Sequence, residues 1–196
     1  MLASLQKEDK LLKVALTDKK KRALDSPSRL VETRRIKAIE DFSVMVFNGS
    51  RHGTVCIVEG QPGGYVQVDK NGDSVVSIAD GAWLGEDAII TDASNFAGVA
   101  CGYTRITKSD VGKDTIIAGR VIIKNSTIGK NVTIYGTIAI KDSEIADGAT
   151  IIGSTVIRHS KIGKNATLEA AGVVDHRNIE DGELCISPLE RAAWIG

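Results

Sequence analysis

The sequence predicts an all-β solenoid with a seventeen-residue coil, and three observations support this fold. Large aliphatic residues recur once per coil in three columns. Residues that tolerate a positive φ recur with the same step between these columns. Aromatic residues form only 4% of the chain, which is too few for an ordinary globular core. A core of stacked isoleucine and valine does not need them.

The aliphatic columns define the coil. The first column contains Val111, Ile128, Ile145, Ile162 and Ile179. The second contains Ile117, Ile134, Ile151, Leu168 and Cys185, and the third contains Ile123, Ile140, Ile157 and Val174. A helix would not keep three anchors in phase over this repeat, so the pattern indicates short strands. Stacked coils then give parallel strands about 4.8 Å apart, with like side chains above like.

Turn residues occupy fixed places between the columns. Three residues after the first anchor come Asp114, Asn131, Gly148, Asn165 and Gly182. A second corner holds Asn125, Asp142, His159 and His176, and a third column holds Gly119, Gly136 and Gly153. Sharp corners between short strands need a positive φ, which glycine, asparagine and aspartate accept at low cost. The turn residues therefore support the same arrangement of short strands as the aliphatic columns.

Residues 1–32 are expected to form a basic helical arm. Leu2, Leu5, Leu12, Val14 and Leu16 give an apolar stripe, and the basic residues Lys19, Lys20, Lys21 and Arg22 follow. A helix over residues 2–24 would end at Asp25-Ser-Pro27, because the residue before a proline disfavours the helical conformation. The first 37 residues carry eleven Lys and Arg against five Asp and Glu, although the formal charge of the whole chain is zero.

The remaining chain divides into three predicted parts. Residues 33–77 are expected to form a small β segment that caps the solenoid, and residues 78–186 to form the solenoid itself. The step from Leu84 to Val111 exceeds one coil by ten residues, which predicts an insertion loop over about 96–105. Residues 187–196 depart from the repeat and are expected to cap its open end.

The repeat resembles the hexapeptide-repeat β-helix. Units such as Val111-Gly-Lys-Asp-Thr115, Ile128-Gly-Lys-Asn-Val132 and Ile162-Gly-Lys-Asn-Ala166 carry the resemblance. It implies a left-handed parallel β-helix with a triangular cross-section. Enzymes of that superfamily mostly keep coils one residue longer than the coil of this chain.

A second resemblance lies in the N-terminal part. Arg35-Ile-Lys-Ala-Ile-Glu-Asp-Phe42, Gly63-Gly-Tyr-Val66 and Gly81-Ala-Trp83 are similar to the opening of the YdcK-type β-helical proteins of enterobacteria and their prophages. That family brings no established reaction.

The superfamily resemblance makes acyl transfer from coenzyme A one hypothesis. Such enzymes use a histidine at a coil edge as general base, and a base with a pKa near 7 suits this role. His159 and His176 are the candidates, because they occupy one corner column on adjacent coils. The simpler interpretation is that both are turn residues. No metal site is predicted, because the third histidine, His52, lies outside the repeat.

A binding protein is the second hypothesis. Its candidate residues are Phe96, Cys101, Tyr103 and Arg105 in the predicted insertion, together with Lys19, Lys20, Lys21 and Arg22. The simpler interpretation of the insertion is a flap that packs over one face of the solenoid. The simpler interpretation of the basic run is a solvated helix end. Hexapeptide-repeat proteins are commonly trimers, so a homotrimer is expected.

We favour a non-enzymatic β-helical scaffold or binding protein of phage or prophage type. It would act through protein–protein contacts, and modulation or inhibition of a host protein is one form of this function. The alternative is a coenzyme A-dependent acyltransferase of the hexapeptide-repeat class, and coenzyme A is a cofactor only in that case. The chain has no long apolar run, no secretion signal and no paired cysteine motif among its three cysteines. A cytoplasmic location without membrane contact is therefore expected, and nucleic acid is not favoured as a partner.

Overall fold

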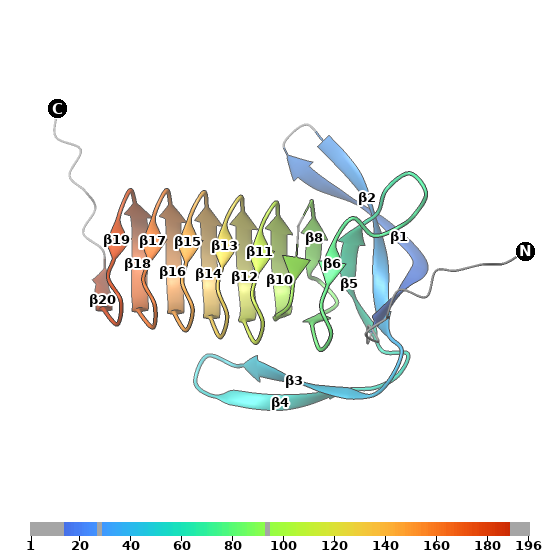
Figure 1. The fold of residues 1–196 in the computed structure, drawn as a ribbon, viewed down its shortest axis with the longest axis horizontal. Helices are drawn as coiled ribbons and strands as arrows, with labels where there is room; N and C mark the ends of the chain where they lie inside the picture. Colours follow the sequence, from blue (N-terminus) through green and yellow to red (C-terminus); the bar gives the residue numbers. More distant parts are fainter. Residues whose placement is uncertain (1–13, 27–28, 93–94, 189–196) are drawn as a thin grey trace, which may run out of the picture.

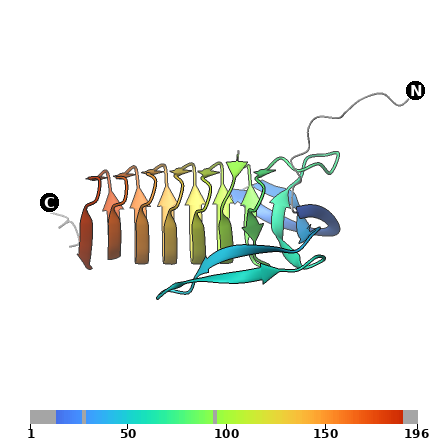
Figure 2. The same cartoon turned by 60° about the horizontal axis from the view of Figure 1, so that its bottom comes forward.

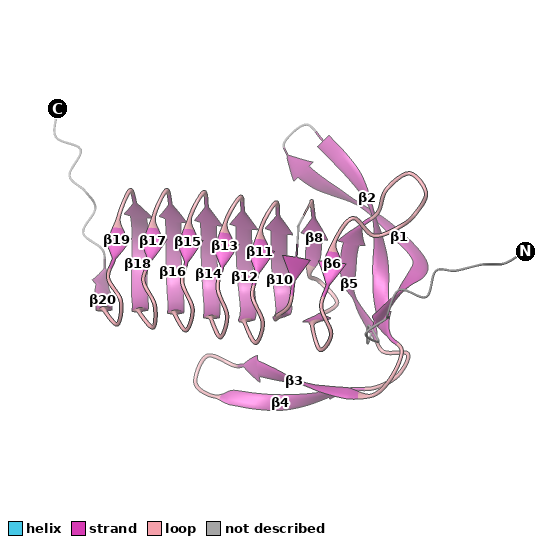
Figure 3. Cartoon of the chain, viewed as in Figure 1, coloured by secondary structure: helices cyan, strands magenta, loops and turns pink. Residues whose placement is uncertain are grey.

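The solenoid predicted from the repeat is confirmed. A computed structural model describes residues 14–26, 29–92 and 95–188, and this part is an all-β solenoid of about 6 coils of ~17 residues (Figure 1). Figure 3 shows strands and loops, and no helix, throughout these residues. The long strands belong to an 11-stranded sheet and the short ones to a 7-stranded sheet, counted over the described ranges.

Each regular coil contains one nine-residue strand and one two-residue strand. The long strands are β10 (Val99–Thr107), β12 (Ile116–Lys124), β14 (Thr133–Lys141), β16 (Thr150–Arg158) and β18 (Thr167–Asp175). The short strands are β11 (Asp110–Val111), β13 (Thr127–Ile128), β15 (Glu144–Ile145), β17 (Lys161–Ile162) and β19 (Asn178–Ile179). Long strands pair in parallel at a constant offset of one coil, as Ile117 does with Ile134. The sequence repeat is thus also the strand register.

The three aliphatic columns form the core. Ile134, Ile151 and Ile123 are completely buried, and they belong to one continuous cluster that runs the length of the solenoid. Burial of such a side chain stabilises the fold by about 1.5–3 kcal/mol relative to exposure. Each coil alone could not bury its anchors, so stability depends on stacking.

Both predicted corner columns adopt the left-handed conformation. At the second corner φ is 52° for Asn125, 49° for Asp142, 46° for His159 and 51° for His176. Asp92 and Lys108, with φ of 45° and 50°, precede them in this column. The left-handed conformation costs a non-glycine residue about 1–2 kcal/mol, so the corners are maintained by the stacked strands.

The glycine column lies at the middle of the long strands. Gly136 has a φ of 133°, and a Cβ added there would overlap the carbonyl oxygen of Gly153 on the next coil. In these coils the absence of a side chain lets the strand bend from one face of the coil to the next without a clash with the neighbouring coil.

A buried serine column satisfies its own hydrogen bonds. The hydroxyl of Ser143 donates to the carbonyl of Lys141 at 2.7 Å and accepts the N–H of Ser160 at 3.2 Å. Ser126 makes the same pair of bonds, to Lys124 O and from the N–H of Ser143. Each hydroxyl thus joins its own corner to the next coil, and both serine side chains are paired despite their burial.

The insertion predicted over about 96–105 is wrong. Phe96 lies in β9 (Asn95–Phe96), pairs with Val111 and is completely buried. The nine residues of β10 continue the long-strand register, with Ala100 beside Ile117. This segment is a coil of the solenoid.

The predicted insertion results from the assignment of Leu84 to the wrong aliphatic column. β6 (Ser77–Ile78), β7 (Trp83–Leu84) and β8 (Ile89–Thr91) form the first coil. Leu84 pairs with Ala100 and so belongs to the second column, whereas Ile78 starts the first. The first coils also deviate from the regular length, because the step from Ile78 to Phe96 is longer than the regular repeat and the step from Phe96 to Val111 is shorter.

The helix predicted over residues 2–24 is wrong for its described part. Val14–Ser26 forms strand β1, which pairs antiparallel with β2 (Arg29–Ala38), and residues 1–13 lie outside the described residues. β2 pairs in turn with β5 (Pro62–Gln67), which is parallel to β8 of the first coil. Pairing with β2 outweighs the low strand propensity of the lysines, since such propensities depend on context.

β1 is an edge strand of the large sheet, and its basic residues suit that place. Lys20 forms an ion pair of 2.8 Å with Glu32 on β2, and the register shifts between Leu16 and Lys20. Lysines and a bulge on an edge strand hinder pairing with other chains. At the other end β20 (Leu184–Pro188) terminates the sheet. Residues 189–196 of the expected C-terminal cap lie outside the described residues.

A long hairpin lies along one side of the solenoid. Strands β3 (Phe42–Phe47) and β4 (His52–Ile57) pair only with each other and run beside the coils (Figures 1 and 2). Phe47 contacts Tyr135 of β14 edge to face, with ring centroids 5.4 Å apart. Within the described ranges no helical segment has the length and hydropathy that a transmembrane span requires.

We expect Ile134→Asp to unfold the solenoid, because an unpaired buried carboxylate costs several kcal/mol. The control Thr137→Asp lies on the same strand but faces solvent, and should change the melting temperature little. Thermal melts followed by circular dichroism would test both variants. Equal melting temperatures for Ile134→Asp and wild type would contradict the anchor assignment.

Candidate functional site

Two surfaces carry the candidate residues. The first is the histidine corner, formed by His159, His176, Asp175 and Asp142. The second is the outer sheet face, formed by residues that point outward from the second half of the long strands.

The histidine corner arises from the strand register. Arg158 pairs with Asp175, so His159 and His176, the next residue in each coil, stack directly. Their rings are 4.6 Å apart between centroids and 24° from parallel. Nδ1 of His159 lies 3.2 Å from Oδ1 of Asp175, and Nδ1 of His176 lies 2.9 Å from the same oxygen. One carboxylate oxygen thus contacts both rings.

Asp142 contacts the histidine corner from the preceding coil. Its Oδ2 lies 3.6 Å from Nε2 of His159, and its Oδ1 accepts a hydrogen bond of 2.6 Å from Asn125. Lys141 adds an ion pair to Asp142 at 3.3 Å, and Arg158 adds one to Asp175 at 3.4 Å. Both nitrogens of His159 therefore face carboxylates.

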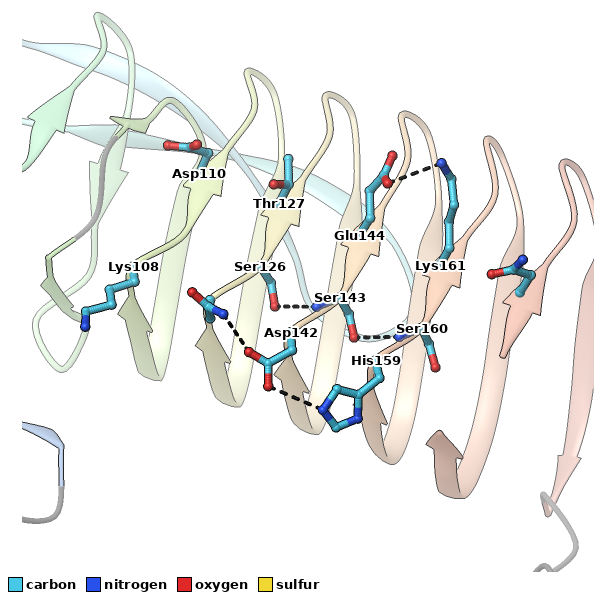
Figure 4. Close-up of a pocket in the computed structure, with 12 residues that line it drawn as sticks. Lys108, Asp110, Ser126, Thr127, Asp142, Ser143, Glu144, His159, Ser160 and Lys161 are labelled. Carbon is cyan, nitrogen blue, oxygen red and sulfur yellow. Dashed lines mark hydrogen bonds and ion pairs between the residues drawn. The ribbon is translucent and has the colours of Figure 1, made fainter. Parts of the chain in front are cut away.

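The corner borders an open polar depression of about 550 Å³ (Figure 4). Figure 4 shows Asp142 beside His159, with the serine column above them and Glu144 paired with Lys161. The depression is lined by polar side chains from successive coils. It is open to solvent and does not enclose a small molecule.

Hydrogen bonds keep both aspartates ionised. The amide of Asn125, followed by Lys141, lowers the pKa of Asp142 below the ordinary aspartate value. The hydrogen bond with His159 is the main reason that the pKa of Asp175 is also lowered, with a further contribution from Arg158. Both carboxylates are therefore available as acceptors at neutral pH.

The outer sheet face begins with a basic–aromatic patch of Tyr103, Arg105 and Arg120. Nη2 of Arg105 donates a hydrogen bond of 2.8 Å to the Tyr103 hydroxyl, and its guanidinium lies 4.6 Å from the ring centroid. Arg120, which pairs with Tyr103 on the next coil, lies 5.7 Å from the same centroid. The hydrogen bond and charge of Arg105, together with Arg120, lower the pKa of Tyr103.

The N-terminal ribbon belongs to the same sheet as this patch. The charge of Lys21 on β1 also lowers the pKa of Tyr103, so the two side chains lie within electrostatic range. Lys21 Nζ lies 5.3 Å from the ring centroid of Tyr65, where Arg35 also stacks. Lys21, one residue of the predicted basic run, is therefore within electrostatic range of the Tyr103 region, which the sequence treats separately.

An apolar row follows the patch along the outer sheet face. It consists of one residue per coil: Ile122, Ala139, Val156 and Val173. Ile122 and Val173 are 47% and 49% exposed, so the row presents aliphatic surface to solvent. The row borders a shallow groove of about 400 Å³.

The remaining predicted binding residues do not join this surface. Phe96 is a buried core residue, and Cys101 is half-buried, with the pKa of its thiol raised by burial. Lys19 and Lys20 are exposed on β1. Arg22 lies in β1, but its side chain is outside what the structure describes.

Sequence reasoning missed Arg120, Asp142 and Asp175 as members of these sites. Arg120 follows Tyr103 by one full coil, so the repeat itself predicts that they stack. Asp175 precedes His176 directly, and its contact with His159 follows from the same register. The sequence feature that could have predicted these residues is the coil repeat, because it places polar residues one coil apart side by side just as it does the aliphatic anchors.

No protein-family model and no curated protein sequence matches this chain. Among solved structures, a Bacillus cereus protein described as a "putative acetyltransferase" matches with a TM-score of 0.48 and 18% sequence identity. The match covers 58% of this chain and 74% of that one. No activity or substrate follows for this chain from similarity at this level.

We expect Asn125→Ala to raise the pKa of Asp142 toward about 3.9, the ordinary aspartate value. Because the folded pKa is depressed, these contacts stabilise the fold above the unfolded pKa, and this contribution is lost as pH falls through the folded pKa. Carbon-13 NMR titration of the Asp142 carboxyl would measure the shift. Asn131→Ala, at the other left-handed corner, is the control and should leave the titration unchanged.

Proposed function

We propose that this protein is a non-enzymatic β-helical scaffold that binds a protein partner through the basic–aromatic patch. The observation that supports this best is the cluster of Tyr103, Arg105 and Arg120 on the outer sheet face, where Arg105 donates a hydrogen bond to the Tyr103 hydroxyl and both guanidinium groups lie near its ring. Modulation or inhibition of a host protein by a phage or prophage product is one form of this function.

The chemistry of the patch favours an acidic protein surface as the partner. Arginine and tyrosine are the residue types that contribute most to protein interfaces. Here the Arg105–Tyr103 hydrogen bond holds both side chains in place before binding, which lowers the entropic cost of association. Guanidinium groups also bind carboxylates in a bidentate manner.

The apolar row suits a second role, which is self-association into the expected homotrimer. The row carries no charge and repeats once per coil on a regular sheet. Rows of this kind on two copies match in spacing, because both follow the distance between coils. Burial of Ile122 and Val173 would remove exposed aliphatic surface from water.

A coenzyme A-dependent acyltransferase is the second candidate, and one observation favours it. Asp175 holds Nδ1 of His176 at 2.9 Å, which leaves Nε2 available to accept a proton. Against this candidate, His176 is 74% exposed and the adjacent depression is open. Saturable binding of coenzyme A in calorimetry, lost in His176→Asn, would favour the enzyme over the scaffold.

We expect the double variant Arg105→Glu/Arg120→Glu to weaken binding of an acidic partner at least tenfold, because it reverses two charges that flank Tyr103. A fluorescent polyglutamate peptide at low salt, followed by anisotropy, is the probe. The control Arg51→Glu/Lys130→Glu changes the net charge equally at exposed positions elsewhere. An equal loss in both variants would show that only net charge matters, and would contradict the patch.

We expect light scattering to give about three times the 20.8 kDa chain mass for the wild type at micromolar concentration. Ile122→Lys/Val173→Lys should yield monomers, since two charges would be buried in the contact. Thr137→Lys, on the outer sheet face beside the row, is the milder control. A monomeric wild type would refute the trimer.

A further inference from the structure

We propose that His159, His176 and Asp175 form a binding site for a divalent transition-metal ion such as Zn²⁺. The inference is independent of the proposed scaffold function. It also differs from the acyltransferase hypothesis, because it uses the histidines as ligands and not as bases.

The donor atoms have the separations that one ion requires. Oδ1 of Asp175 lies 3.2 Å from Nδ1 of His159 and 2.9 Å from Nδ1 of His176. Two donors on a tetrahedral zinc ion are about 3.3 Å apart, given zinc–nitrogen and zinc–oxygen bonds of about 2.0–2.1 Å. The ligand atoms of the three residues all lie within 4.8 Å of one another. Small side-chain rotations are therefore enough to bring them around one ion.

The backbone holds the two histidines in place. His159 and His176 share one corner column, and both adopt the left-handed conformation with φ of 46° and 51°. Backbone bonds join the corners to the preceding coils, with His159 N donating to Lys141 O and His176 N to Arg158 O. Asp175 is the last residue of β18, and strand pairing fixes it beside Arg158. The three ligands are thus attached to a rigid sheet.

A second layer of contacts supports the ligands. Histidines that bind metals commonly present their other ring nitrogen to a carboxylate, which fixes the tautomer and the ring orientation. Asp142 Oδ2 lies 3.6 Å from Nε2 of His159, and Asn125 holds that aspartate through a hydrogen bond of 2.6 Å. Arg158 Nη2 contacts Oδ2 of Asp175 at 3.4 Å, so Oδ1 is the oxygen turned toward both histidines.

The ligand set defines the class of ion. Two imidazoles and one carboxylate suit Zn²⁺, Ni²⁺ or Cu²⁺, whereas Mg²⁺ and Ca²⁺ prefer oxygen ligands alone. Binding would replace the two histidine contacts to Oδ1 with bonds to the ion, with both histidines neutral and unprotonated at Nδ1. Water would complete the coordination, because His176 is 74% exposed.

Such an ion would join two adjacent coils near the C-terminal end of the solenoid. The link runs from the corner after β16 to the corner after β18. A ligand that binds only the folded state stabilises it by mass action. At about 100 times its dissociation constant, the ion should raise the melting temperature by about 5–10 °C.

The test is calorimetric titration of the untagged, chelator-treated full chain with ZnCl₂. We expect binding of one ion per chain, weakened at least tenfold in His176→Asn and in Asp175→Asn. Asparagine keeps the corner, since Asn125 already occupies this column in the left-handed conformation. Co²⁺ added to the wild type should give visible absorption bands with nitrogen–oxygen ligation, absent in His176→Asn.

Two controls separate this site from other zinc ligands. His52→Asn changes the histidine on the hairpin, and Cys56→Ser removes an exposed thiol. Both should bind Zn²⁺ like the wild type. The proposal is overturned if the wild type binds no Zn²⁺ at about 100 µM, the weakest affinity of interest for such a site. It is equally overturned if affinity survives in His176→Asn, or is lost in His52→Asn or Cys56→Ser.

Discussion

The structure depends on one constraint, the in-register stacking of parallel coils. Every regular long strand pairs with the next at an offset of one coil, so each inward residue lies on its own equivalent. The hydrophobic core, the serine hydrogen bonds and the left-handed corners all follow from this repetition. A coil has no core of its own, so the loss of one anchor such as Ile134 affects both neighbouring coils.

The same constraint arranges the functional surfaces. Because a residue lies beside its equivalent on the next coil, Tyr103 meets Arg120 and His159 meets His176 without any special loop. The spacing between coils suits ring stacking and short hydrogen bonds across strands. A solenoid thus turns a linear periodicity into columns of side chains, and a change of residue type in a column creates a site.

The N-terminal part modifies the solenoid on two sides. The β1–β2 ribbon extends the large sheet beyond the first coil and places Lys21 over the Tyr65 ring, within electrostatic range of Tyr103. The β3–β4 hairpin covers a different side, where Phe47 packs on Tyr135. The apolar row of Ile122 and Val173 remains exposed on the outer sheet face, and this leaves it free to contact other molecules.

The repeat by itself determined the solenoid, its coil length, the anchors from Val111 onward and the left-handed corners, because each coil repeats the same local chemistry. It did not determine the phase of the first coils, where Phe96 and Ala100 replace the usual aliphatic anchors and uneven spacings hide the period. It also did not determine that Val14–Ser26 is a strand, since pairing with β2 decides this. The proximity of Lys21 to the Tyr103 patch is also set by the tertiary structure alone, because the pairing of β1 with β2 and of β2 with β5 attaches this distant segment to the large sheet.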